Sequence, residues 1–125
     1  MSSAGATAVG SCLVEPREDG GTARAVDCDS AHVAEVYSVQ SVPDAGFPGT
    51  EALDERADDL CYRPFADYVG ASFEKSDFDY GWFAPDRLEW DRGERRIVCV
   101  ILPPEDVDTL RGSVRGGGGA ATQPA

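Results

Sequence analysis

The sequence predicts an α+β domain with an antiparallel sheet of about five strands, one covering helix and two disulfides. Three observations carry this prediction. Residues 97–102 form the longest unbroken apolar run and are rich in β-branched side chains, which is typical of a strand buried on both faces. Residues 50–61 place apolar side chains at helical spacing. Four cysteines in a short chain are an even set, which fits two disulfides.

Length and charge limit the classes of function. The chain of 125 residues is long enough for one domain. Its 23 acidic residues outnumber the 11 lysines and arginines, and the formal net charge is -12. Such an acidic surface repels phosphate backbones and anionic lipid head groups. We therefore expect the protein to bind neither nucleic acid nor a membrane surface.

A β-hairpin is predicted near the N-terminus. Two stretches with strand character, residues 11–15 and 23–28, flank a turn centred on Gly20. This centring places Cys12 directly opposite Cys28. Opposed residues of a non-hydrogen-bonded pair have Cα atoms about 4.5–5.5 Å apart, which a disulfide accepts. The register therefore favours a Cys12–Cys28 bridge among the three connectivities that four cysteines allow.

The helix is predicted to begin at residue 50, with Thr50 as its N-cap. Apolar side chains at i, i+4, i+7 and i+8 form one stripe, made by Leu53, Ala57, Leu60 and Cys61. Pro64 is expected to end or kink the helix, because proline lacks an N–H and its ring clashes with the preceding turn.

The other elements are shorter. Residues 33–39 read as a strand rich in strand formers. Residues 82–84 are predicted to pair with residues 95–102 through a turn at 90–95, which makes a second hairpin. One helical turn is expected at 106–110. The central strand would then have a neighbour on each side.

The second disulfide follows from the helix and the central strand. Cys61 lies on the core-facing stripe and Cys99 at the centre of the apolar run, so a helix lying on the sheet would bring them together. Two disulfides imply an oxidising compartment. Neither a secretory signal nor a membrane-spanning run is visible. We therefore expect part of an exported precursor, with membrane contact only through a tether absent from this chain. The alternative is four buried, reduced cysteines in an intracellular protein.

The ends of the chain have the composition of tails. Residues 1–8 are small and polar, and we expect a flexible N-terminal tail. Residues 115–125 are rich in glycine and are expected to form a flexible C-terminal tail. The single folded domain is predicted to span residues 9–114.

Several short motifs surround the four cysteines. They are Val9-Gly10-Ser11-Cys12, Val26-Asp27-Cys28, His32-x-x-Glu35, Cys61 in the helix, and Trp90-x-x-Gly93-Glu94-Arg95-x-Ile97-x-Cys99. Together they resemble the septum formation domain family over about residues 9–114. The resemblance implies an exported or membrane-tethered protein of the actinobacterial cell envelope with a role in cell division. It implies no catalytic residue.

His32 is the only histidine and the main candidate for chemistry. Paired with a free Cys28 it would suit a thiol-dependent enzyme or redox protein. Paired with Glu35 it could hold a metal ion or transfer a proton. The structural alternative is that His32 bonds to Asp29, to Glu35 or to a backbone carbonyl. No Cys-x-x-Cys spacing supports a structural zinc site.

Aromatic side chains are the candidates for binding. Trp82, Phe83 and Trp90 could contact a sugar or a peptide if they are exposed. The alternative for Trp90 is to cap the core. We expect a non-enzymatic, extracytoplasmic module without a cofactor or metal ion. Its expected partner is a protein or a cell-wall component near the division septum.

Overall fold

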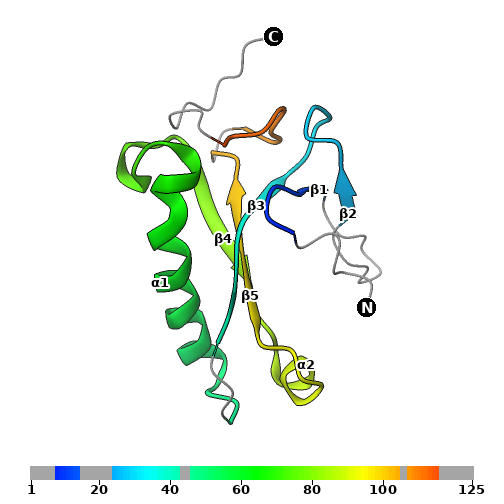
Figure 1. Ribbon diagram of the computed structural model, residues 1–125, viewed down its shortest axis with the longest axis vertical. Helices are drawn as coiled ribbons and strands as arrows, with labels where there is room; N and C mark the ends of the chain where they lie inside the picture. The colour runs from blue at the N-terminus through cyan, green and yellow to red at the C-terminus, as the bar shows by residue number, and fades with distance from the viewer. Residues whose placement is uncertain (1–7, 15–23, 43–45, 105–106, 116–125) are drawn as a thin grey trace.

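The fold is taken from a computed structural model that describes residues 8–14, 24–42, 46–104 and 107–115. Its elements are β1 (Cys12–Val14), β2 (Arg24–Val26), β3 (Ala34–Ser41), α1 (Thr50–Val69), the 3₁₀ turn η2 (Phe73–Lys75), β4 (Asp79–Phe83), α2 (Arg87–Asp91) and β5 (Arg96–Leu102). The strands form one antiparallel sheet in the order β2-β1-β3-β5-β4. Helix α1 lies along one side of the central strands, and the β1–β2 pair lies on the other side (Figure 1). The predicted fold class is confirmed.

The apolar run forms the interior strand that the sequence predicts. β5 pairs with β3 on one side and with β4 on the other. Its side chains alternate between two clusters: Ile97, Cys99 and Ile101 pack with residues of α1. Val98 and Val100 belong to a second cluster on the opposite face, together with Leu13, Ala34 and Val36. Both faces of the strand are therefore buried.

A β-bulge in β3 aims a tyrosine at the helix. Val36 opposes Val100 and Ser38 opposes Cys99, so Tyr37 is the extra residue between two registered pairs. The Tyr37 ring packs in the α1-facing cluster. Burial raises the pKa of its hydroxyl group, which therefore stays protonated.

Helix α1 continues through Pro64, so the expectation that the helix could end there is wrong. Pro64 has no N–H to donate to the Leu60 carbonyl. That carbonyl instead accepts a hydrogen bond of 2.8 Å from the side-chain amide of Gln40 in β3. The helix ends at Gly70, which takes a positive φ of 94°. Its N-cap is Gly49, one residue before the predicted cap. Within the described residues no helix is both long and apolar enough to cross a membrane.

The register of the first hairpin differs from the prediction. Cys12 opposes Val26, not Cys28. Cys28 lies two residues beyond the end of β2, in a turn where the Ser30 N–H donates to the Asp27 carbonyl. This turn brings the Cys28 Cα to 5.2 Å from the Cys12 Cα. The predicted bridge is therefore present, but the turn after β2, and not cross-strand pairing, brings the two cysteines together.

Helix α2 occupies part of the stretch predicted as a simple turn. The Asp86 side chain accepts a bond of 2.8 Å from the Glu89 N–H, and the Glu89 side chain accepts one of 2.9 Å from the Asp86 N–H. This capping box satisfies two donors at the helix start. Gly93, with a φ of 100°, then turns the chain into β5.

The predicted helical turn at 106–110 is wrong for the part that is described. Residues 107–109 have no regular structure, and Leu110 forms an isolated antiparallel bridge with His32. Backbone pairing with a distant segment replaces local helical bonds there. The turn predicted around Gly20 lies outside the described residues.

Both predicted disulfides are confirmed. The Cys61–Cys99 bridge joins α1 to β5 with a Cα separation of 5.4 Å, and both residues are fully buried. The Cys12–Cys28 bridge joins β1 to the turn after β2, where Cys28 is half-buried. No cysteine is free.

Candidate functional site

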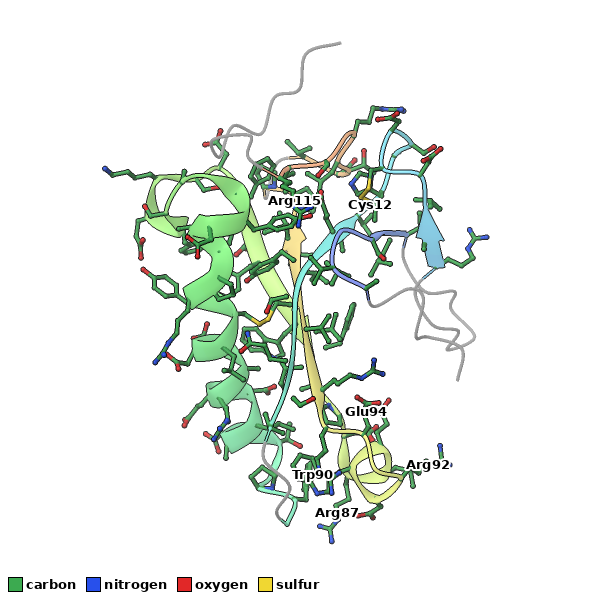
Figure 2. All side chains as sticks on the ribbon, in the orientation of Figure 1. Cys12, Arg87, Trp90, Arg92, Glu94 and Arg115 are labelled. Carbon is green, nitrogen blue, oxygen red and sulfur yellow. A yellow bond between two sulfur atoms is a disulfide. The ribbon has the colours of Figure 1, made fainter. Side chains whose placement is uncertain are left out.

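Four polar side chains, three of them buried, gather at one end of the sheet. His32 and Glu35, both candidates from the sequence, are fully buried there. Cys12 and Arg115 mark this end in Figure 2, and Trp90 and Glu94 mark the opposite end. We call His32, Glu35, Tyr68 and Ser113 the polar cluster.

Glu35 lies at the centre of the polar cluster. Its Oε2 accepts hydrogen bonds from the Tyr68 hydroxyl at 2.5 Å and from the Ser113 hydroxyl at 2.6 Å. Its Oε1 accepts a bond of 2.9 Å from the Val114 N–H. Three donors therefore replace water around a fully buried carboxylate. Burial, reinforced by the hydrogen bond to Glu35, raises the pKa of Tyr68 and keeps that hydroxyl a donor.

His32 has one partnered and one unpartnered ring nitrogen. Nδ1 lies 2.8 Å from the Ser30 carbonyl oxygen, so it carries a proton and donates. Nε2 is buried and has no hydrogen-bond partner within the part of the chain that is described. His32 thus bonds to a backbone carbonyl, which was one of the structural roles considered from the sequence. Its second ring nitrogen, Nε2, keeps an unused lone pair.

A cysteine completes this arrangement. A ring nitrogen of His32, a carboxylate oxygen of Glu35 and the sulfur of Cys12 lie within 4.8 Å of one another. Cys12 stands opposite Glu35 in the pairing of β1 with β3, which places both residues at the same point of the sheet. The sequence suggested Cys28 as the cysteine partner of His32. The structure brings Cys12 there instead, bonded to Cys28.

The segment after β5 closes this end of the sheet. The His32 N–H donates to the Leu110 carbonyl at 3.0 Å, and the Leu110 N–H donates to the His32 carbonyl at 2.7 Å. The Gly112 N–H donates to the Cys28 carbonyl at 2.6 Å. Together with the bonds to Glu35, these contacts hold residues 110–114 against β3. Sequence reasoning missed Tyr68 and Ser113, because neither lies in a motif.

The three aromatic candidates do not form one patch. The Trp82 indole N–H donates to Asp54 of α1 at 3.1 Å. Phe83, the next residue of β4, is 46% exposed. Trp90 is only 5% exposed, and the Arg95 guanidinium stacks 3.9 Å from the centre of its ring. Trp90 therefore caps the core, which the sequence analysis gave as the alternative to a binding role.

A groove crosses the sheet face opposite α1, and we call it the sheet groove. Its volume is about 480 Å³. It is lined by Leu13, Val14, Val33, Ala34, Gly81, Trp82, Phe83, Val100, Leu102, Pro103 and Asp108. Gly81 leaves room there, since a Cβ at this position would lie 3.1 Å from Leu102 Cδ1. The groove ends at β4, which is one of the two edge strands of the sheet.

A second groove, of about 760 Å³, lies between the start of α1 and Trp90. Its wall includes charged side chains of α1, among them Asp59 and Arg63. These two residues form an exposed i,i+4 ion pair of 3.1 Å. Because such pairs are typical of a solvated helix surface, this groove offers less to a specific partner than the sheet groove.

Comparison with known families gives a match to most of the chain. Residues 9–123 match the family described as Septum formation, which covers nearly the whole chain. No curated protein and no solved structure matches the sequence.

Proposed function

The chain belongs to the septum formation family, and we propose that it is a non-enzymatic module of the cell envelope that binds a protein partner near the division septum. The observation that carries the binding role is the sheet groove next to the edge strand β4. The family supports the link to division. The paired cysteines support a place outside the cytoplasm.

The redox chemistry of the cysteines supports the proposed location. All four are joined in two disulfides, and the bridges connect separate parts of the fold. Disulfides form and persist in exported proteins, whereas cytosolic thiols are kept reduced. A small domain with two such bonds is suited to an extracytoplasmic setting. We therefore place the module at the outer side of the cell membrane.

The sheet groove fits an extended polypeptide better than a polysaccharide. Among the described residues that line it, Asp108 is the only charged one, and the others are apolar, aromatic or glycine. A sugar would need a row of polar side chains to bond its hydroxyl groups. An extended peptide needs apolar pockets and an unpaired strand, and no other strand of the described chain pairs with the outer edge of β4.

The negative charge of the protein indicates that the partner segment is positively charged. Asp79 at the start of β4 and Asp108 at the groove are both exposed. The whole chain carries a formal net charge of -12. Complementary charge speeds encounter and selects partners. The proposed partner segment therefore alternates apolar residues with lysine or arginine.

The competing hypothesis is a thiol-dependent enzyme or redox protein that uses a free cysteine with His32. Cys12 is the cysteine that lies beside His32 and Glu35. Its sulfur is bonded to Cys28, so it is not a free thiol. The binding role thus has the better support.

Site-specific photocrosslinking in the host cell tests the binding role. A benzoylphenylalanine at position 83 reports on the sheet groove, and one at position 62 is the control. Phe83 and Tyr62 are exposed to similar extents, 46% and 44%, and lie on β4 and α1 respectively. We expect a protein adduct of defined mass from position 83 only. Equal adducts from both positions, or none from position 83, would contradict the role of the groove.

The proposed location needs a separate measurement. Cells are quenched in acid and their free thiols are alkylated before the protein is isolated. We expect no alkylated cysteine, because both bridges are formed in the cell. Recruitment of a fluorescent fusion to the septum should be lost with Phe83→Ala and kept with Tyr62→Ala. Reactive thiols in the freshly isolated protein would instead favour the enzyme hypothesis.

A further inference from the structure

The pocket formed by Cys12, His32 and Glu35 contains donor atoms that the binding role does not use. We propose that opening the Cys12–Cys28 bond turns this pocket into a binding site for a borderline-soft divalent cation such as Zn²⁺. The three residues supply one sulfur, one nitrogen and one oxygen, which lie within 4.8 Å of one another. Metal binding and disulfide formation at Cys12 then exclude each other.

The imidazole is arranged as a metal ligand is. Histidines that bind metals almost always donate their other ring N–H to a carbonyl or carboxylate, which fixes the tautomer. Nδ1 of His32 donates to the Ser30 carbonyl, and Nε2 is buried without a protein partner in the described structure. A buried acceptor without a partner costs free energy, so the site gains from any ion that takes this lone pair.

The carboxylate is also held as a ligand would be. Glu35 is fixed by Tyr68, Ser113 and the Val114 N–H, and ligating carboxylates are themselves commonly hydrogen-bonded. Oε1 accepts only the Val114 N–H among these bonds, so it keeps a lone pair for an ion. Ligands around a tetrahedral zinc lie about 3.3–3.7 Å apart. The donor atoms therefore need to approach one another by at most about 1.5 Å from separations of up to 4.8 Å.

Charge favours a divalent ion in this buried place. A Cys12 thiolate and the Glu35 carboxylate carry two negative charges, and His32 is neutral when Nε2 is a ligand. A bound Zn²⁺ makes the group neutral, which removes the cost of burying uncompensated charge. The three residues leave one coordination position open.

The disulfide controls the site. While Cys12 is bonded to Cys28, its sulfur is not a thiolate and cannot bind zinc well. A dithiol reductant opens the bond by transferring two electrons and two protons, and it becomes a disulfide itself. Cys28 is the half-buried partner and Cys12 the buried one, so a thiolate reaches Cys28 and releases Cys12 into the pocket. Binding of the ion then displaces the Cys12 thiol proton.

Two matched variants test the site in the 125-residue chain. Cys28→Ser and Cys12→Ser both lack the same bridge, but only Cys28→Ser leaves a thiol beside His32 and Glu35. Co²⁺ serves as the probe, and the thiolate-to-cobalt charge-transfer band reports sulfur ligation. We expect one equivalent of Co²⁺, displaced by Zn²⁺, in Cys28→Ser and no band in Cys12→Ser. Adding His32→Gln to Cys28→Ser should weaken binding by at least about 10-fold.

Two outcomes of the cobalt titration would overturn the proposal. A folded Cys28→Ser chain without the band, or equal bands in both variants, overturns the proposal. Circular dichroism, together with an intact mass that shows the Cys61–Cys99 bond, establishes that the chain is folded. If Cys28→Ser does not fold, the unmodified chain is reduced mildly until one bridge is open. Zn²⁺ should then slow re-formation of that bridge, and unchanged re-formation would also overturn the proposal.

Discussion

Glu35 has no exposed surface, yet donors from two distant parts of the chain converge on its carboxylate. Tyr68 comes from the last turn of α1, whereas Ser113 and Val114 come from the segment after β5. A carboxylate in this position links three segments that share no local sequence. It holds the C-terminal segment over the end of the sheet and holds one wall of the proposed metal pocket.

Replacing Glu35 by glutamine should lower the free energy of unfolding by about 3 kcal/mol. The amide group presents an N–H₂ to the donors of Tyr68, Ser113 and Val114, so at least one buried donor loses its acceptor. Urea unfolding followed by tryptophan fluorescence measures the change. Glu74→Gln is the matched control, because Glu74 also accepts a tyrosine hydroxyl, from Tyr62 at 2.6 Å, but is exposed.

The control variant should keep the unfolding midpoint of the parent protein. If Glu35→Gln and Glu74→Gln shift the midpoint equally, burial does not distinguish the two contacts. The role assigned to Glu35 in holding the C-terminal segment would then be wrong.

At the scale of elements, β3 does more than pair with its neighbours. It supplies the amide that caps the Leu60 carbonyl, and its bulge directs the Tyr37 hydroxyl to the Cys61 carbonyl. The two acceptors are the carbonyls of Leu60 and Cys61, which lie in the turn of α1 just before Pro64. The strand therefore completes the hydrogen bonding of a helix that its own sequence would interrupt.

A double-mutant cycle between Gln40 and Pro64 should reveal this support. Gln40→Ala leaves the Leu60 carbonyl without a donor and should cost about 1–2 kcal/mol in the parent protein. In a Pro64→Ala background the new Ala N–H can donate to that carbonyl, so Gln40→Ala should cost less. We expect a coupling energy of about 1 kcal/mol from urea unfolding of the four proteins.

Loss of the second bond of Gln40 does not disturb this comparison. Its amide also donates to the Ser38 hydroxyl at 2.9 Å, and Gln40→Ala removes that bond in both backgrounds. The contribution therefore cancels in the cycle. Strictly additive effects of the two substitutions would show that Gln40 does not compensate for the proline.

For the whole molecule, the two disulfides act at different places. Cys61–Cys99 joins the helix layer to the interior strand across 38 positions, and Cys12–Cys28 joins the β1–β2 pair to its following turn across 16. The first lies in the α1-facing core, whereas the second borders the polar cluster. One bridge thus fixes the layers, and the other can be opened with less disturbance of the core.

Removing Cys61–Cys99 should cost more stability than removing Cys12–Cys28. Loop entropy alone gives about 4 kcal/mol for the longer loop and about 3 kcal/mol for the shorter one. Alanine at both Cys61 and Cys99 also leaves a cavity, because these residues are fully buried. Thermal unfolding of the two double-alanine variants measures the order. A greater loss of stability on removing Cys12–Cys28 would show that this bridge, beside the polar cluster, stabilises the fold more than the core bridge does.

Local sequence patterns were enough to predict the class of the fold and the pairing of Cys61 with Cys99. The apolar run of β5 has no polar face, so it had to lie inside a sheet. The helical spacing of Leu53, Ala57 and Cys61 is a local property of the sequence, and it puts all three on one apolar face that has to pack on the sheet. With Cys61 on the stripe and Cys99 in the run, the second disulfide followed directly.

The tertiary structure alone decided the continuity of α1, the register of the first hairpin and the composition of the candidate site. Pro64 is tolerated because Gln40, twenty-four positions earlier, donates to the Leu60 carbonyl. Cys12 lies beside Glu35 because β1 pairs with β3, and Ser113 reaches Glu35 only through the path of the C-terminal segment. These contacts join residues far apart in the chain, and their energies depend on long-range packing that no local pattern encodes.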